Sequence, residues 1–470
     1  MDVLESLLIQ EKTLASQIQV IEDLLSGVRV HIAELRSVNR GAGTYNLPSE
    51  TLSAIFEAGL PETPKTRERG RSSWLDRSEE RTTPFELLVS SVSRRWRNVA
   101  LQTPRLWGVL VIQVLGSVHD LYDLYLHRSK MCPLDITLEC SFGDGPRNKS
   151  DWNIIVKRHL ERLIPHIVRW RKFVVRNGYI ESQLSALSHL CAPALETLVL
   201  DFIPNEQEME LFTGGAPRLS SLELVGANFR PPLGAIKYFK LSTIFLGSPL
   251  SYDRLSQFIQ PMRSLTRLSI TANIVLDAGN CPLIEVPSVL ALDICFNHHD
   301  TKCGTLCILD FPAVESLTIH SAANVAIGAL TRNHRVYPHV QSFTLVNDSE
   351  YGDRENAPVA LALDFISLLP DVREVAFQGT DPSAILNALC NRKPTDELLW
   401  PDLSAITVVA ARRATVMHKK QTWSWIVKVV DNQIQLGHPI SSIRLSSQIV
   451  ERGGQRQKQR LIEQAALTVC

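Results

Sequence analysis

Pro193-Ala194-Leu195-Glu196-Thr197-Leu198-Val199-Leu200 is one copy of a short phrase that returns along most of the chain. The phrase is a proline or polar residue followed by L-x-x-L-x-L, with other apolar residues replacing leucine in many copies. The copies start at positions 168, 193, 217, 239, 263, 287, 312, 338, 370 and 401. Most steps are 22 to 26 residues, and the last two lengthen to 32 and 31. Self-similarity at a nearly fixed period indicates a repeat array.

This period suits one short strand, a turn and a return segment, which is the unit of a leucine-rich repeat. Each unit buries its leucines only against its neighbours, so the copies must stack. Segments 255–259 and 384–389 have the apolar spacing of helical returns. The fold class is therefore predicted as α/β, with a leucine-rich repeat solenoid, or horseshoe, over residues 130–445. A parallel α/β domain is the alternative, and ten evenly spaced copies favour the solenoid.

The positions between the inward leucines predict the surface that a partner would contact. In a solenoid these side chains line the concave face, where extended partners bind. Most are small and polar, as at Thr197 and Ser221, and the copy at Leu241–Leu246 contributes Thr243. We expect recognition of a target protein to rest on the four best anchors, which are Glu223, Phe245, Arg267 and Asp293.

A second pattern occupies the start of the chain, where apolar residues alternate in steps of three and four. The seam consists of Leu4, Leu7, Leu14, Ile18, Ile21, Leu25, Val28, Ile32 and Leu35, and Glu11 interrupts it. This spacing predicts a coiled-coil helix over residues 1–40 and a homodimer through residues 4–35. A single helix packed on its own domain is the alternative. At the other end, the polar run Gln455 to Arg460 predicts a solvated tail over 446–470.

A third pattern lies between the seam and the repeats. Leu47-Pro48-Ser49-Glu50-Thr51-Leu52 with Ile55-Phe56 comes first, followed by Val92-Ser93-Arg94-Arg95-Trp96-Arg97 and Pro104-Arg105-Leu106-Trp107. Pro48 suits a helix start, where its missing N–H costs nothing. Apolar residues then recur at three-to-four spacing, which predicts a small helical module over residues 45–110. Residues 62–83 are rich in Arg, Glu, Ser and Thr and predict a mobile insertion.

The third pattern resembles an F-box, a small three-helix partner-binding module. Together with Cys132-Pro133-Leu134-Asp135-Ile136, Arg169-Trp170 and the proline-led repeats, it is similar to F-box proteins abundant in mushroom-forming fungi. The chain departs from the family pattern in two places. The insertion at 62–83 separates helices that an ordinary F-box joins closely, and Ser93 stands where the family often has cysteine.

This resemblance implies a substrate adaptor of an SCF ubiquitin ligase, acting in ubiquitin-dependent protein degradation. The module would contact the Skp-type linker subunit, while the repeats would hold an unidentified target protein and catalysis would belong to the ligase partners. The implied linker contacts are Leu47, Pro48, Leu52, Ile55, Phe56, Leu88, Val92 and Trp96. A non-catalytic scaffold outside a ubiquitin ligase is the alternative, with the helical module serving only as the N-terminal cap of the repeats.

The composition bears on the class of partner and on the cellular location. The 49 basic and 49 acidic side chains balance, so no global field favours nucleic acid or a membrane. No apolar run reaches the roughly 18 to 20 residues that span a bilayer, and the acidic N-terminus does not suit a secretory signal. The odd count of nine scattered cysteines fits reduced thiols. The expected location is cytoplasmic or nuclear.

No motif for catalysis or cofactor binding stands in the sequence. A glycine-rich phosphate loop, a nucleophile elbow and a His-Glu-x-x-His helix are all missing, so we expect a non-enzymatic protein without a cofactor. One cluster could ligate zinc and consists of Cys295, His298, His299, Cys303 and Cys307. Its spacing matches none of the usual zinc patterns, so no metal is expected there.

Overall fold

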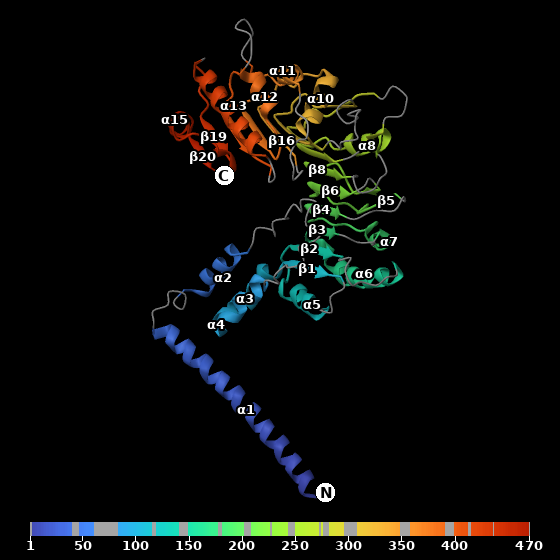
Figure 1. Cartoon of the computed structure of the whole chain (residues 1–470). Coiled ribbons are helices and arrows are strands. Elements are labelled where there is room, and N and C mark those ends of the chain that lie inside the picture. The colour runs from blue at the N-terminus through green and yellow to red at the C-terminus, as the bar shows by residue number, and fades with distance from the viewer. Residues whose placement is uncertain are drawn as a thin grey trace. The chain divides into compact units, whose positions relative to one another are not determined.

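The computed structural model in Figure 1 shows helices near the N-terminus and a long sheet of strands beyond them. It describes residues 2–39, 47–60, 83–114, 119–140, 149–176, 181–201, 208–225, 228–242, 250–271, 274–275, 282–295, 308–347, 358–390, 399–411, 415–435 and 437–469. The chain forms two compact units. One comprises Met1–Leu110 with Val118–Pro133, and the other Val111–Ser117 with Leu134–Cys470.

The first unit is helical. Its elements are α1 (Asp2–Asn39), α2 (Ser49–Ala58), α3 (Phe85–Val92), α4 (Arg94–Gln102), the 3₁₀ turn η1 (Pro104–Trp107) and α5 (His119–Arg128). Prolines stand immediately before α2 and α3 and begin η1, where a missing N–H leaves no bond unmade. We name the part from α2 to α5 the helical module. The predicted insertion at 62–83 lies outside the described residues, apart from its last residue.

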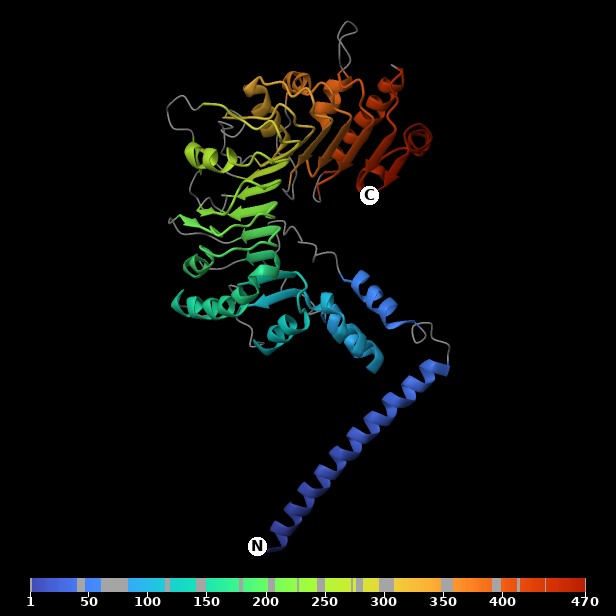
Figure 2. The same ribbon diagram turned by 180° about the vertical axis from the view of Figure 1, so that it is seen from behind.

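The second unit is built on one sheet of 14 strands in the described part of the chain. The strands follow sequence order, and every pair from β2 to β20 is parallel (Figure 2). They are β1 (Val109–Gln113), β2 (Leu134–Glu139), β3 (Trp170–Arg176), β4 (Thr197–Asp201), β6 (Ser221–Val225), β8 (Tyr238–Ser242), β10 (Arg267–Thr271), β13 (Ala291–Cys295), β15 (Ser316–His320), β16 (Ser342–Val346), β17 (Glu374–Gln378), β18 (Ala405–Val409), β19 (Ser442–Leu445) and β20 (Leu467–Val469). A mixed α/β fold with a long parallel sheet is confirmed.

The register explains why the short phrase repeats. Leu198 pairs with Leu222, and the same column continues through Leu268, Leu292 and Leu317, all of them buried. Because side chains alternate along a strand, the apolar positions two residues apart face one side of the sheet, and the positions between them face the other. The repeated leucines therefore build one continuous core along the sheet.

Return segments cover the apolar side of the sheet. The described returns include α6 (Lys149–Leu163), η2 (Ile164–Arg169), α7 (Glu181–Leu184), η3 (Ser185–Leu187), α8 (Tyr252–Ile259), α10 (Ala323–Asn333), α11 (Val359–Leu368), α12 (Ser383–Cys390) and α13 (Val416–Gln435). Phe239 of β8 stacks on Phe258 of α8 at 5.7 Å between ring centroids, and Phe343 of β16 contacts Phe365 of α11 at 5.2 Å. The core thus lies between the sheet and its returns.

Several returns are extended instead of helical. They carry the short strands β5 (Met209–Glu210), β7 (Phe229–Arg230), β9 (Leu250–Ser251), β11 (Ile274–Val275), β12 (Ile284–Glu285) and β14 (Leu309–Asp310). These pair in parallel as β5 with β7, β9 with β11 and β12 with β14. The two longer steps, from 338 to 370 and from 370 to 401, leave room for the full helices α11 and α12.

One strand is placed differently from the sequence prediction. The predicted strand position within Leu241–Leu246 is wrong. The strand is β8 (Tyr238–Ser242), in which Phe239 and Leu241 are buried. The first apolar residue of this copy is the buried Ile236, just before the strand, and Phe239 pairs in register with Leu222 of β6 and Leu268 of β10. Thr243 and Phe245 lie outside the described residues.

The C-terminal segment also differs from the prediction. Residues 446–470, expected to form a solvated tail, contain α14 (Ser447–Val450), α15 (Gln455–Ala465) and β20. Two residues of α15 that are four positions apart, Leu461 and Ala465, are buried. β20 pairs in parallel with β19 and extends the sheet by one strand. The sheet also begins earlier than residue 130, with β1.

A partly exposed ion pair joins the strands β2 and β3 at the start of the sheet, with Asp135 buried and Arg171 exposed. Arg171 of β3 donates two hydrogen bonds to the Asp135 carboxylate of β2, at 2.8 and 2.7 Å. The register between β2 and β3 shifts beside Asp135, which pairs with Lys172 in the ladder, so Arg171 lies at the irregularity. The hydrogen bonds to Asp135 raise the pKa of the Arg171 guanidinium further, against the lowering effect of burial. The bidentate geometry is the strongest form of such a pair.

Candidate functional site

The helical module has a closed core of its own. Leu52 and Phe56 of α2 are buried together with Val89, Val99, Leu106 and Trp107. The Phe56 ring lies 4.9 Å from the Trp96 ring of α4. Leu52 and Phe56 were expected to contact a linker subunit. In the structure they are core residues, so a partner could not contact them without opening the module.

Other apolar side chains of the same helices point outward. Ile55 of α2 is 47% exposed, and Leu88 and Val92 of α3 are 53% and 58% exposed. Leu88 and Val92 are four residues apart and share one face of α3. Pro48 is also exposed, while Leu47 and Trp96 are half-buried. We name Pro48, Ile55, Leu88 and Val92 the apolar surface; it comprises four of the eight predicted linker contacts.

Local contacts hold α2, α3 and α4 together around this surface. The Arg95 guanidinium donates to the Leu47 carbonyl at the entrance to α2. A Cβ added at Gly59 would lie 2.7 Å from the Phe85 ring, so a larger residue where α2 ends would have to displace that ring of α3. Ser93 begins α4, and its hydroxyl accepts a hydrogen bond from the Trp96 N–H at 3.2 Å. Ser93, which stands where the F-box pattern often has cysteine, therefore acts as the N-cap of α4.

Trp107 anchors the module at its other end. Its Nε1–H donates to the Ala100 carbonyl at 2.9 Å, and the Tyr125 ring of α5 meets it edge-on at 5.0 Å. The Arg128 guanidinium lies 4.4 Å from the Trp107 ring centroid. Tyr125 donates its hydroxyl hydrogen to the Glu86 carboxylate, and burial followed by this hydrogen bond raises the pKa of Tyr125. The two ends of the module are thus joined through α3 and α5.

The polar side of the sheet forms a second candidate surface. Three of the predicted target contacts, Glu223, Arg267 and Asp293, lie at polar-side positions of β6, β10 and β13. Correcting the register of β8 adds Lys240, which pairs with Glu223 and was missed from the sequence. Asp293 also lies 3.1 Å from His320 of the neighbouring strand β15. This surface carries charges of both signs, and Phe245 is not among its described residues.

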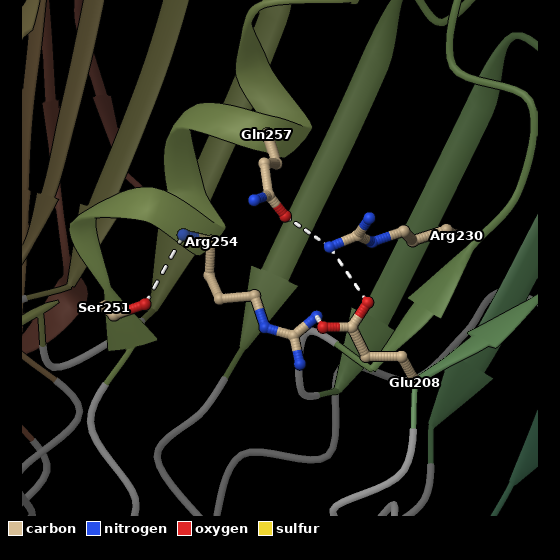
Figure 3. A network of polar contacts seen from close by, with 5 residues as sticks. All are labelled: Glu208, Arg230, Ser251, Arg254 and Gln257. Carbon is tan, nitrogen blue, oxygen red and sulfur yellow. Dashed lines mark hydrogen bonds and ion pairs between the residues drawn. The ribbon is translucent and has the colours of Figure 1, made fainter.

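A separate polar network joins consecutive returns. Glu208 lies 3.0 Å from Arg230 of β7 and 2.6 Å from Arg254 of α8, so one carboxylate bridges two guanidinium groups (Figure 3). Arg230 also donates to Gln257, and the Ser251 hydroxyl accepts from the Arg254 N–H at the start of α8. These contacts join one repeat to the next, so we interpret the network as a structural feature and not as a binding site.

The candidate zinc cluster lies mostly outside the described residues. Of the candidate zinc cluster, Cys295 ends β13, while His298, His299, Cys303 and Cys307 lie outside the described residues. Across the part of the chain that the structure does describe, no group of three or more His, Cys, Asp or Glu side chains could hold a metal ion. Within the same residues, no helix combines the length and apolar character needed to cross a membrane.

Comparison with known proteins does not identify a relative of this chain. No protein-family model matches the chain, and no curated protein matches it with significance.

Proposed function

We propose that the chain is a substrate adaptor of an SCF-type ubiquitin ligase, with the helical module as an F-box that binds a Skp-type linker subunit. The carrying observation is the apolar surface, because Ile55, Leu88 and Val92 stay exposed on a small module whose core is already complete. Exposed apolar side chains on short helices, two of which share one face of α3, are candidates for a protein interface. The sequence pattern from Leu47 to Trp107 supports the same proposal.

In this proposal the sheet unit is a leucine-rich repeat solenoid that holds the target protein. Its polar side presents Glu223, Lys240, Arg267 and Asp293 on four adjacent strands. Charges of both signs favour a partner with complementary charges, which contributes more to specificity and association rate than to affinity. Catalysis is assigned to the ligase partners.

Charge placed on the apolar surface is expected to abolish linker binding. Leu88→Asp with Val92→Asp would bury two unpaired carboxylates in the interface, so we expect binding at least about 100-fold weaker, or about 2.7 kcal/mol. The measurement is co-purification of the full chain with a fungal Skp-type subunit, by size-exclusion chromatography with light scattering. Met131→Asp, an exposed apolar residue outside α2 and α3, serves as the control and should bind like the wild type.

Two results would overturn the adaptor proposal. One is undiminished binding of the double Asp variant, because the complex would then not use the apolar surface. The other is absence of a complex with both the wild type and the control. The Leu47→Ala, Pro48→Ala variant extends the test to the start of α2.

A second observation concerns the oligomeric state and fits the adaptor and the scaffold alternative equally. The helix α1 is 38 residues long, and its heptad seam is exposed at Leu7, Leu14, Ile18, Ile21, Leu25, Val28 and Ile32. An isolated helix with such a seam gains stability by pairing with a second copy. We therefore propose that α1 forms a homodimer, which an adaptor and a scaffold could both use.

Breaking the seam is expected to halve the mass of the particle in solution. Ile18→Asp with Leu25→Asp places charges at seam positions, so light scattering should fall from a dimer to the 52.6 kDa monomer. Val20→Asp with Val30→Asp is the matched control, because both residues are exposed on α1 but lie off the seam. A monomeric wild type, or dissociation of the control as well, would contradict the homodimer.

A further inference from the structure

The basic and acidic residues of the chain balance overall but not at its C-terminal end. Residues 411–470 contain ten Lys and Arg and three Asp and Glu, which gives this stretch a net charge of +7. The preceding 410 residues therefore carry −7. Such a local excess of positive charge favours an anionic partner at this end of the sheet unit.

One buried tryptophan brings two basic segments of this stretch together. Trp423 of α13 is buried, and its Nε1–H donates to Gln457 of α15 at 2.9 Å. A Cβ added at Gly453 would lie 2.4 Å from the Trp423 ring, so the backbone before α15 rests directly on the indole. Segments 419–420 and 452–458 are therefore neighbours in space although about 30 residues separate them in sequence.

Five cations lie on the segments that meet at this junction. Lys419 and Lys420 precede Trp423 by one helical turn, while Arg452, Arg456 and Lys458 flank its contacts with Gly453 and Gln457. We name Lys419, Lys420, Arg452, Arg456 and Lys458 the junction cations; all are exposed or half-buried, and none has an ion-pair partner among the described residues. Arg460 differs, because Asp431 lies 2.8 Å away and neutralises it. The positive charge at the junction is uncompensated.

Two further features lie on the same end of the sheet unit. β20 is the last strand of the sheet, and its outer edge pairs with no other strand in the described chain. Val469 on this strand is 54% exposed. Val416 and Met417, which precede the junction cations on α13, are exposed apolar residues. An open strand edge can pair with an extended peptide through main-chain hydrogen bonds.

We propose that this end of the sheet unit binds an extended acidic segment of a protein partner. The junction cations would pair with its carboxylates, and the edge of β20 with its backbone. A single-stranded nucleic acid is disfavoured, because such ligands need exposed aromatic rings for base stacking. Here Trp423 is buried and Lys428 covers Trp425 at 4.4 Å.

The test uses the full chain alone and a fluorescein-labelled 12-residue peptide of Glu and Ser, with binding followed by anisotropy. Arg456→Gln with Lys458→Gln should weaken binding about 10-fold or more, as should Lys419→Gln with Lys420→Gln. Lys237→Gln with Arg263→Gln is the matched control, since it removes two exposed, unpaired cations elsewhere on the sheet unit and should leave binding unchanged.

Comparison probes decide the class and mode of the ligand. A peptide of the same charge with alternate N-methylated amides cannot pair with β20 and should bind more weakly. Equal binding of that probe, equal loss in the control variant, or no binding by the wild type would overturn the proposal. Preference for a single-stranded oligonucleotide or for anionic vesicles would also overturn it. No linker subunit takes part, so the outcome is separate from that of the adaptor proposal.

Discussion

Replacing Trp107 by alanine is expected to unfold the helical module. The side chain is fully buried, and its removal would lose packing against Tyr125 and Arg128 as well as the hydrogen bond to the Ala100 carbonyl. Truncation of a buried tryptophan costs about 3–5 kcal/mol. This is a large part of the total stability of a small domain, about 5–15 kcal/mol.

Limited proteolysis measures this effect, because cleavage between residues 85 and 107 requires the module to open. The Trp107→Ala variant should be cut there much faster than the wild type. Trp107→Phe keeps an apolar ring at the site and should lie between the two. A Trp107→Ala variant as resistant as the wild type would contradict the assignment of Trp107 as the anchor of the module.

The second large effect is expected at Gly379, directly after β17. Its φ is +69°, and a Cβ built there would lie 2.1 Å from the Asn347 carbonyl oxygen. The neighbouring ladder cannot yield easily, because the Gly379 N–H donates to Val409 at 2.8 Å and the Asn347 N–H donates to Gln378 at 2.7 Å. For Gly379→Ala we expect a loss above about 3 kcal/mol, combining left-handed strain of about 1–2 kcal/mol with a backbone overlap.

Gly437→Ala separates these two causes. Gly437 also has a left-handed φ, at +81°, but nothing lies within 4 Å of its added Cβ. This variant should lose only the conformational part, about 1–2 kcal/mol. The measurement is the midpoint of urea unfolding of the sheet unit, followed by tryptophan fluorescence. Equal shifts in the two variants would show that the close approach to Asn347 has no energetic consequence.

The repeat phrase predicted most of the sheet because its spacing reflects the sheet register. Leu198 and Leu200 were placed inward from the sequence, and their column continues through the neighbouring strands. The phrase failed at β8 because two overlapping copies exist there, one led by Ile236 and one by Leu241. Even spacing favoured Leu241. The structure uses Ile236, since return segments can differ in length while the strands keep their register.

Other errors came from treating an apolar face as a surface. Leu52, Ile55 and Phe56 share helical spacing, and spacing alone does not say which of them the module covers with its own chain. Leu52 and Phe56 meet the core, while Ile55 is at its margin and stays exposed. Similarly, the polar residues 455–460 suggested a solvated tail, although Leu461 and Ala465 in the same helix are buried. Their spacing of four residues is a signal for a helix with one apolar face. The junction at Trp423 depends on contacts distant in sequence and left no local signal.

Hydrogen exchange of the full chain, with and without a Skp-type linker subunit, tests the central claim most directly. If the helical module binds the linker through the apolar surface, the amides of α2 (Ser49–Ala58) and α3 (Phe85–Val92) should exchange more slowly in the complex. The strands from β4 to β19 should keep their unbound rates. Protection confined to the sheet unit, or no protection of α2 and α3 at saturating linker, would contradict the adaptor account.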